Sequence, residues 1–156
     1  MLISFTQTYG DNRKHLLDIY SRDEKLIEFK NLFDVNIYSF NNCSGDTITY
    51  FNSINKVKNT KILLVNGSYT QSIRQLINYL DELKCTHLFF SQDDTFSYDN
   101  DNINFKELVD YVKGFDNNFM YNLYYNSDQF KEHISLDKIK ELNNLNIFDN
   151  NSLNFS

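Results

Sequence analysis

The sequence has no tryptophan, only two cysteines and no long run of apolar residues. Phenylalanine and tyrosine must therefore supply most of the large buried side chains, and they make up 16% of the chain. Cys43 and Cys85 could pair, but two cysteines define no disulfide framework. No stretch approaches the roughly 20 apolar residues of a transmembrane helix, and the N-terminus lacks the basic segment of a signal peptide. These absences predict a protein without a membrane span in a reducing compartment, with the cytoplasm as its expected location.

Positive charge is also scarce. The chain has 15 Lys and Arg against 21 Asp and Glu, which gives a formal net charge of -6. A nucleic-acid-binding protein needs a basic patch that replaces the counterions of the phosphates, so this balance argues against a nucleic-acid partner. The same balance disfavours attraction to an anionic membrane surface.

Motifs that would indicate several enzyme classes are missing as well. His15, His87 and His133 have no His, Cys or carboxylate partner at the spacing of a zinc site. The chain contains no Gly-X-Ser-X-Gly, P-loop or Gly-X-Gly-X-X-Gly motif. Serine hydrolases, P-loop kinases and dinucleotide-dependent oxidoreductases therefore have no support in the sequence.

Along the chain, segments in which apolar residues repeat every second residue, as in strands, alternate with segments in which they repeat about every 3.6 residues, as in helices. Strands are expected at residues 2–6, 35–40, 61–66, 86–91 and 119–125. Helices are expected around residues 16–20 and 73–80, and over residues 23–33, 47–57, 105–115 and 136–145. We also expect Asp11 or Asn12 to cap the first helix, and Ser68 or Thr70 to start the fourth. This alternation predicts an α/β fold: a Rossmann-like, open and mostly parallel sheet with helices on both faces, in one domain spanning residues 1–156.

Ligands of such sheets bind outside the carboxyl ends of the strands. Four polar turns are expected at that edge, namely residues 6–9, 41–42, 66–68 and 92–95. The last follows the apolar run from Leu88 to Phe90, which we expect to be a central strand buried on both faces. It places Asp93 beside Asp94, and two adjacent carboxylates repel unless water or a cation offsets their charge.

The order of these elements, from residue 2 to residue 96, resembles the nucleotide-binding half of the GT-A glycosyltransferases. In that family the fourth strand ends in an acidic Asp-X-Asp motif that binds a metal ion. Here the corresponding residues are Gln92, Asp93 and Asp94, so Gln92 stands in the place of the first Asp. The resemblance implies a nucleotide-sugar-binding half over residues 1–98 and a shortened acceptor-side half over residues 99–156.

The resemblance also implies a ligand and a cofactor. Asp93 and Asp94 would hold Mn²⁺ or Mg²⁺, whose charge would grip the diphosphate of a nucleoside-diphosphate sugar, with a UDP-sugar favoured. The residues expected to contact that ligand lie in the polar turns and at the start of one helix: Thr6, Gln7, Thr8, Tyr9, Asn41, Asn42, Gly67, Arg74, Gln92 and Asp93. The acceptor of the sugar is unknown.

Structural interpretations compete with several of these roles. Asp94 could cap a short helix in a solvated turn, and residues 6–8 could cap the first helix. Arg74 could pair with Asp81 or Glu82 on the helix surface. Gly67 is expected to supply a turn conformation that bulkier residues resist.

Two classes of function stay open on the sequence alone. The first is a metal-dependent glycosyltransferase-like domain. The second is a non-catalytic α/β module that binds nucleotides or uses its acidic face to bind a protein partner. No catalytic base is assigned, because Asp99, Asp101, Asp116 and Asp128 are candidates by residue type only.

Overall fold

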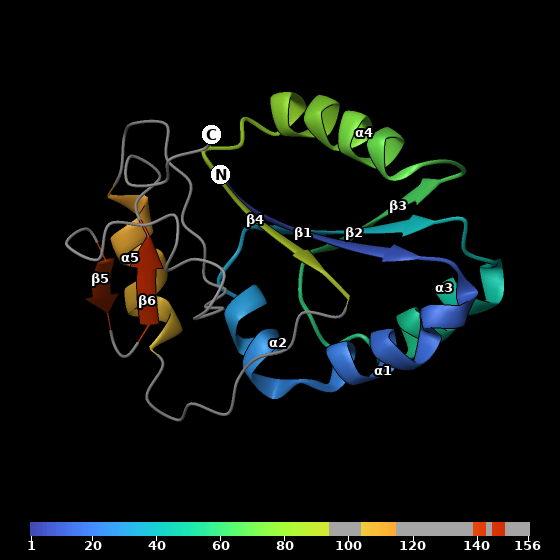
Figure 1. Cartoon of the computed structure of the whole chain (residues 1–156), viewed down its shortest axis with the longest axis horizontal. Coiled ribbons are helices and arrows are strands. Elements are labelled where there is room, and N and C mark those ends of the chain that lie inside the picture. Colours follow the sequence, from blue (N-terminus) through green and yellow to red (C-terminus); the bar gives the residue numbers. More distant parts are fainter. Residues whose placement is uncertain (94–103, 115–138, 143–144, 149–156) are drawn as a thin grey trace. The chain divides into compact units, whose positions relative to one another are not determined.

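The computed structural model describes residues 1–93, 104–114, 139–142 and 145–148 (Figure 1). The chain divides into two compact units, Met1–Tyr98 and Asp99–Ser156. None of the helices in these described ranges is long and apolar enough to cross a membrane.

The first unit is built on a four-stranded sheet in the order β3-β2-β1-β4, in which every neighbouring pair is parallel. Its strands are β1 (Leu2–Tyr9), β2 (Val35–Asn41), β3 (Thr60–Val65) and β4 (His87–Gln92). Its helices are the short 3-10 helix η1 (Asp11–Arg13), α1 (Lys14–Arg22), α2 (Glu24–Lys30), α3 (Gly45–Ile54) and α4 (Tyr69–Glu82). Helix α4 covers one face of the sheet, whereas α1, α2 and α3 cover the other (Figure 1). The predicted α/β fold with a parallel sheet and helices on both faces is confirmed.

Alternating side chains of the strands supply a separate core on each face of the sheet. Beneath α4, Ile3 and Phe5 of β1 pack with Ile37 of β2 and Leu76 of the helix. On the opposite face, Tyr38 and Phe40 of β2 pack with Leu17 and Tyr20 of α1, Leu26 of α2 and Phe51 of α3. Each helix therefore holds its place by burying one apolar stripe.

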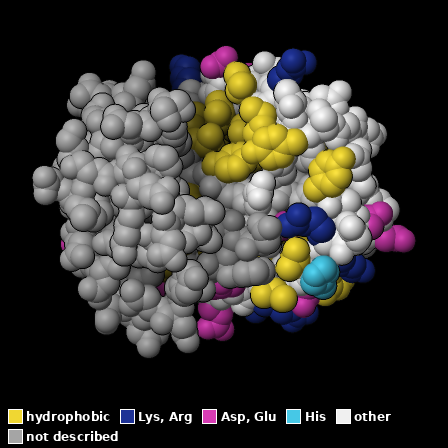
Figure 2. All heavy atoms as spheres, in the orientation of Figure 1, with side chains coloured by type: hydrophobic (Ala, Val, Ile, Leu, Met, Phe, Trp, Pro, Cys, Tyr) yellow, Lys and Arg dark blue, Asp and Glu magenta, His cyan; other side chains and the backbone are white. Residues whose placement is uncertain are grey.

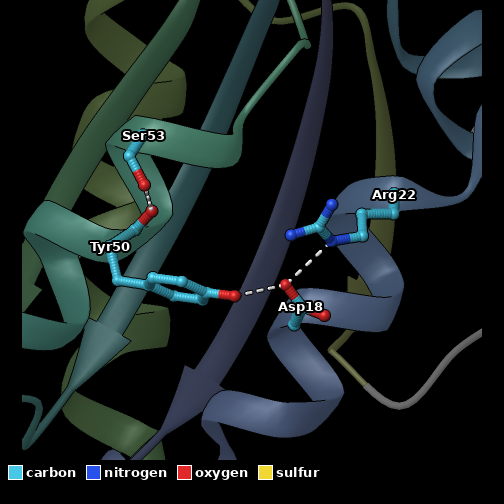
Figure 3. Close-up of polar contacts among 4 residues, drawn as sticks. All are labelled: Asp18, Arg22, Tyr50 and Ser53. Carbon is cyan, nitrogen blue, oxygen red and sulfur yellow. Dashed lines mark hydrogen bonds and ion pairs between the residues drawn. The ribbon is translucent and has the colours of Figure 1, made fainter.

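Polar contacts join α1 to α3 at the edge of the second core (Figure 3). The hydroxyl of Tyr50 donates to Asp18, and the Nε atom of Arg22 lies 2.9 Å from the same carboxylate oxygen. The hydrogen bond from Tyr50, followed by that from Arg22, lowers the pKa of Asp18 below its ordinary value. Ser53 Oγ donates to the carbonyl oxygen of Tyr50 at 2.6 Å. Of these contacts, the bond from Tyr50 to Asp18 joins the two helices, and the other two lie within α1 and within α3.

The turn after β1 differs from the prediction. Helix α1 begins at Lys14 after η1, and no side chain caps its first residues, so neither Asp11 nor Asn12 caps it. Asp11 Oδ1 instead accepts hydrogen bonds from the backbone N–H of Ser44 at 2.7 Å and from Thr47 Oγ1 at 2.6 Å, both at the start of α3. The bond from Thr47, followed by that from Ser44, lowers the pKa of Asp11. The predicted cap Ser68 is confirmed, since it caps α4 in a capping box with Gln71. Asn104, for which no cap was predicted, caps the helix of the second unit.

Strand β4 is the edge of the described sheet, so the prediction of a central strand buried on both faces is wrong. Phe89 packs against Phe29 and Phe33, at centroid distances of 4.8 and 5.9 Å. Leu88 and Phe90 point to the α4 face and are 41% and 40% exposed. Neither belongs to the core beneath α4, which is built on β1 and β2 with Leu63 of β3 packed beside them. Figure 2 shows apolar side chains gathered in the region between α4 and β4.

The second unit contains α5 (Phe105–Lys113) and the strands β5 (Ile139–Leu142) and β6 (Leu145–Phe148), which pair antiparallel. Helix α5 confirms the helix predicted from residue 105, and it ends at Lys113, two residues before the predicted end. The helix expected over residues 136–145 is wrong at 139–142 and 145, where the backbone is extended. The two strands pair with Leu142 opposite Leu145. In the sequence, Ile139 and Leu142 are three residues apart, which is a helical spacing, and this is why a helix was predicted. The strand expected at residues 119–125 lies outside the described residues.

Candidate functional site

A pocket of about 220 Å³ opens at the carboxyl end of the parallel sheet. Its lining comes from the ends of two adjacent strands and from the segments that follow β1 and β3: Gln7, Tyr9, Arg13, Tyr69, Gln92 and Asp93. Gln7 of β1 and Gln92 of β4 are register partners, so the two strands deliver their last residues to the same place. This is the edge at which ligands of open α/β sheets bind.

Asp93 and Arg13, which both line the pocket, form an ion pair. The side chain of Asp93 is 1% exposed, and its Oδ1 atom lies 2.5 Å from Nη2 of Arg13. Its Oδ2 atom accepts a hydrogen bond from Thr8 Oγ1, and its backbone N–H donates to the carbonyl oxygen of Gln7 at 3.0 Å. A buried carboxylate is tolerated when a cation and hydrogen bonds compensate it, and these partners do so here.

Gln7 is the second buried polar side chain of the pocket. It is 4% exposed, and its Nε2 atom donates to Ser72 Oγ of α4. Ser72 Oγ in turn donates to the carbonyl oxygen of Tyr69 at 2.8 Å. The Oε1 atom of Gln7 is buried and has no hydrogen-bond partner in the described part of the chain. An unsatisfied acceptor of this kind costs about 1–3 kcal/mol, and an N–H or O–H group of a ligand would satisfy it.

Two exposed tyrosines lie at the mouth of the pocket. Tyr9 at the end of β1 is 48% exposed, and Tyr69 at the start of α4 is 46% exposed. The hydroxyl of Tyr9 accepts a hydrogen bond from Asn42 Nδ2 at 3.0 Å, which anchors one end of its side chain. Exposed aromatic rings beside a pocket can stack on a flat ligand such as a nucleobase.

The three residues predicted in the second and third turns shape the loops beside the pocket and do not line it. Asn42 has a positive φ of 52°, and its side chain donates to the carbonyl oxygen of Gly67 at 3.0 Å and accepts from its N–H at 2.9 Å. Asn41 is fully buried and accepts from Ser39 Oγ at 2.9 Å. A Cβ atom on Gly67 would lie 1.4 Å from Gln71 Oε1, so a larger residue would displace the Gln71 side chain and would also strain the backbone, whose φ is 158°.

Thr6 and Thr8 belong to β1, which extends to Tyr9, and so they cannot cap the first helix. Both face the α1 side of the sheet. Thr6 Oγ1 lies 3.0 Å from the hydroxyl of Tyr20 and 3.1 Å from Ser91 Oγ, so it is engaged within the core. Thr8 reaches the site indirectly, because its hydroxyl holds Asp93.

Arg74 lies apart from these groups. It is exposed on α4 and is not among the residues that line the pocket. It is a surface residue of α4, as the structural interpretation expected, but it forms no ion pair with Asp81 or Glu82 in the described part of the chain.

Sequence reasoning missed Arg13 and Tyr69. Arg13 is the first basic residue after the first predicted strand, and it follows the turn that was expected at residues 6–9. Tyr69 directly follows the predicted helix cap Ser68. Both positions could have been proposed from their places next to predicted strand and helix ends, although their approach to Asp93 and Gln7 depends on the tertiary fold.

The described residues do not fit a divalent cation. They contain no group of three or more His, Cys, Asp or Glu side chains that could hold a metal ion. Mg²⁺ and Mn²⁺ prefer an octahedral set of oxygen ligands, whereas both oxygens of Asp93 already bind Thr8 and Arg13. An ion at Asp93 would also lie beside the guanidinium charge of Arg13. Asp94, the second predicted ligand, lies outside the described residues.

Comparisons with protein-family models, with curated proteins and with solved structures find no match to this chain. The likeness to GT-A glycosyltransferases therefore depends on the order of the elements. The function must be inferred from the pocket itself.

Proposed function

We propose that this chain is a glycosyltransferase-like domain that binds a nucleoside-diphosphate sugar, with a UDP-sugar favoured, and transfers the sugar to an acceptor. The observation that carries the proposal is the pocket at the carboxyl ends of β1 and β4, where the buried Oε1 atom of Gln7 lacks a partner. A nucleobase has both a hydrogen-bond donor for Gln7 and a flat ring for the tyrosines. Its ring N–H can donate to Gln7, and its flat face can stack on Tyr9 or Tyr69.

The size of the pocket supports partial burial of the ligand. At about 220 Å³ it is smaller than the roughly 300–1,000 Å³ of pockets that enclose a whole drug-sized molecule. A base fits such a volume, and the phosphates and sugar would then extend toward the mouth. The pocket also carries a positive charge on Arg13, whose side chain is 32% exposed.

The transfer step rests on the resemblance, and donor binding is the part that the pocket supports. A catalytic base would have to deprotonate the hydroxyl of the acceptor. The four candidates for this role, Asp99, Asp101, Asp116 and Asp128, lie outside the described residues. Neither the acceptor nor the stereochemistry of the transfer is assigned.

A panel of thermal shifts tests donor binding directly. A ligand that binds the native state alone raises the melting temperature, by an amount that grows with its concentration over Kd. We expect UDP and UDP-sugars to raise the melting temperature more than GDP, and uridine to raise it less than UDP. The proposal would be contradicted if no nucleotide or nucleoside changed the melting temperature and calorimetry also detected no binding.

The second candidate function, a non-catalytic protein-interaction module, is favoured by one observation. Leu88 and Phe90 expose apolar surface on the edge strand of the described sheet. This candidate predicts no response to nucleotides in the same panel. It also predicts that a Leu88→Ser, Phe90→Ser variant loses self-association or partner binding while it still folds, with a melting temperature lowered by the loss of the buried part of these two side chains.

A further inference from the structure

The ion pair between Arg13 and Asp93 is asymmetric in its exposure. The carboxylate is 1% exposed, whereas the guanidinium side chain is 32% exposed and lines the pocket. The pair therefore hides its negative partner and presents its positive partner to a ligand. An acidic residue that the resemblance assigns to metal binding serves here to hold an arginine.

The chemistry of this arrangement suits a phosphate. A guanidinium carries several N–H donors in one plane, and its fork matches the oxygens of a phosphate. The contact of Arg13 with Asp93 is made through its Nη2 atom. Thr8 donates to the second oxygen of Asp93, so the carboxylate is compensated from two sides and repels an incoming anion less than a free carboxylate would.

We propose that Arg13, positioned by Asp93, is the cation that binds the diphosphate of the ligand, so that nucleotide binding at this pocket needs no divalent metal ion. This inference rests on the proposed function. It departs from the expectation of Mn²⁺ or Mg²⁺, because the two oxygens that would coordinate the ion are the ones that hold Thr8 and Arg13.

The two arrangements make different predictions for one substitution. If Asp93 were a metal ligand, Asp93→Asn would weaken binding of UDP in the presence of Mn²⁺ and have little effect in a chelator. If Asp93 positions Arg13, the same change should weaken UDP binding equally in a chelator and in Mn²⁺. The single amide oxygen of asparagine can accept from Thr8 or from Arg13 but not from both.

The decisive experiment is calorimetry of UDP and of uridine, each in EDTA and in MnCl₂, with four proteins. The double variant Arg13→Gln, Asp93→Asn removes both charges together and leaves no uncompensated buried carboxylate. Arg13→Lys keeps the charge and the ion pair but loses the planar fork. Arg22→Gln is the matched control, because Arg22 forms an ion pair with Asp18 on α1 outside the pocket.

We expect wild-type protein to bind UDP in EDTA, with a Kd that Mn²⁺ changes by less than about threefold. The double variant should bind UDP roughly 10- to 100-fold more weakly, as expected for the loss of a charge-assisted contact. Uridine, which lacks phosphates, should bind both proteins alike, and Arg22→Gln should behave as wild type. Arg13→Lys should fall between wild type and the double variant, which keeps the test open if the double variant does not fold.

Binding of UDP that requires Mn²⁺, or a folded double variant that binds UDP as wild type does, would overturn this inference while leaving nucleotide binding intact. Failure of the proposed function itself would give a different result. If neither UDP nor uridine binds with or without Mn²⁺, both proposals are overturned together.

Discussion

The ammonium nitrogen of Lys30 donates a hydrogen bond to the hydroxyl of Tyr38 at 3.1 Å and lies 4.2 Å from the centroid of the same ring. Lys30 is fully buried at the end of α2, and its nitrogen also lies 4.5 Å from the ring of Tyr20 and donates to Thr6 Oγ1. Its partners in the described structure are hydroxyls and ring faces. Burial therefore lowers the pKa of Lys30 well below its ordinary value.

We predict that Lys30→Met raises the free energy of unfolding at pH 7 by about 1–2 kcal/mol, because an apolar side chain of similar length avoids the cost of burying an amine. Urea denaturation measures this difference. The matched control is Lys61→Met, which removes an exposed lysine 5.8 Å from the ring of Tyr79 and should change stability little. A Lys30→Met variant that is less stable than wild type would mean that the hydrogen bonds to Thr6 and Tyr38 outweigh the burial cost.

The lowered pKa of Lys30 should also make the free energy of unfolding depend on pH. The pKa of Lys30 is lower in the folded protein than the roughly 10.4 of an unfolded chain. Between these two values the unfolded state binds more protons, so stability rises with pH across that window. The stability gained by Lys30→Met should therefore shrink from pH 7 to pH 9.5.

The measurements must stop near pH 9.5 because burial raises the pKa of Tyr20 to about 12 and also raises that of Tyr38. These two groups contribute stability that is lost as pH rises above the ordinary tyrosine pKa of about 10. Stability curves of wild type and Lys30→Met that run parallel from pH 7 to pH 9.5 would contradict the assignment to Lys30.

The two faces of β4 differ in how well they are covered, and substitutions on them should therefore differ in their effect on stability. Phe89→Ala should lower the free energy of unfolding by about 3 kcal/mol, because it removes a ring that packs on Phe29 and Phe33. Phe90→Ala should cost about 1 kcal/mol, since its ring is 40% exposed and its aromatic contact is with Phe5 at 5.5 Å. Denaturation of both variants measures the difference, and equal losses would show that β4 is covered on both faces.

The general fold could be predicted because its signals are local. Alternating apolar residues in β1 and β2, and the helical period in α4, each arise from neighbours within one element. Even the burial of Lys30 had a local signal, because it follows Leu26 by four residues and so lies on the apolar face of α2. No local signal in the sequence indicated that β4 lies at the edge of the described sheet, since the apolar run at residues 88–90 is compatible with either a central or an edge strand.

The candidate site was predictable only in part for the same reason. Gln7, Tyr9, Gln92 and Asp93 could be placed at the carboxyl edge, because parallel strands bring their ends together. The pairing of Asp93 with Arg13 joins residues that are 80 positions apart, and no spacing in the sequence encodes it. A carboxylate that follows a strand suggests a metal ligand until its partner is known.

Gly67 should be sensitive to the smallest possible substitution. Gly67→Ala would force a Cβ atom into Gln71, whose Oε1 atom accepts from the backbone N–H of Ser68 at 2.8 Å in the capping box of α4. We expect a loss of about 1–2 kcal/mol in the free energy of unfolding, from this lost cap and from backbone strain.

A double-mutant cycle identifies the cause. If the clash with Gln71 accounts for the loss, Gly67→Ala in a Gln71→Ala background should cost less than it does in the wild type. Additive losses would place the cause in the backbone conformation of Gly67, whose φ is 158°.

Gln7→Met separates the stability of the pocket from its ligand binding. Methionine has a similar length, and it removes the unpartnered Oε1 atom at the expense of the hydrogen bond to Ser72. These two effects have similar size and opposite sign, so the free energy of unfolding should change by less than about 1 kcal/mol. Affinity for uridine and for UDP should fall by about tenfold or more, because the acceptor for the ring N–H is gone. Calorimetry with both ligands and urea denaturation of the same protein measure the two effects. A folded Gln7→Met variant that binds uridine as tightly as wild type would remove Gln7 from the base-binding role, while equal weakening of uridine and UDP would assign its contact to the base and leave the phosphates to Arg13.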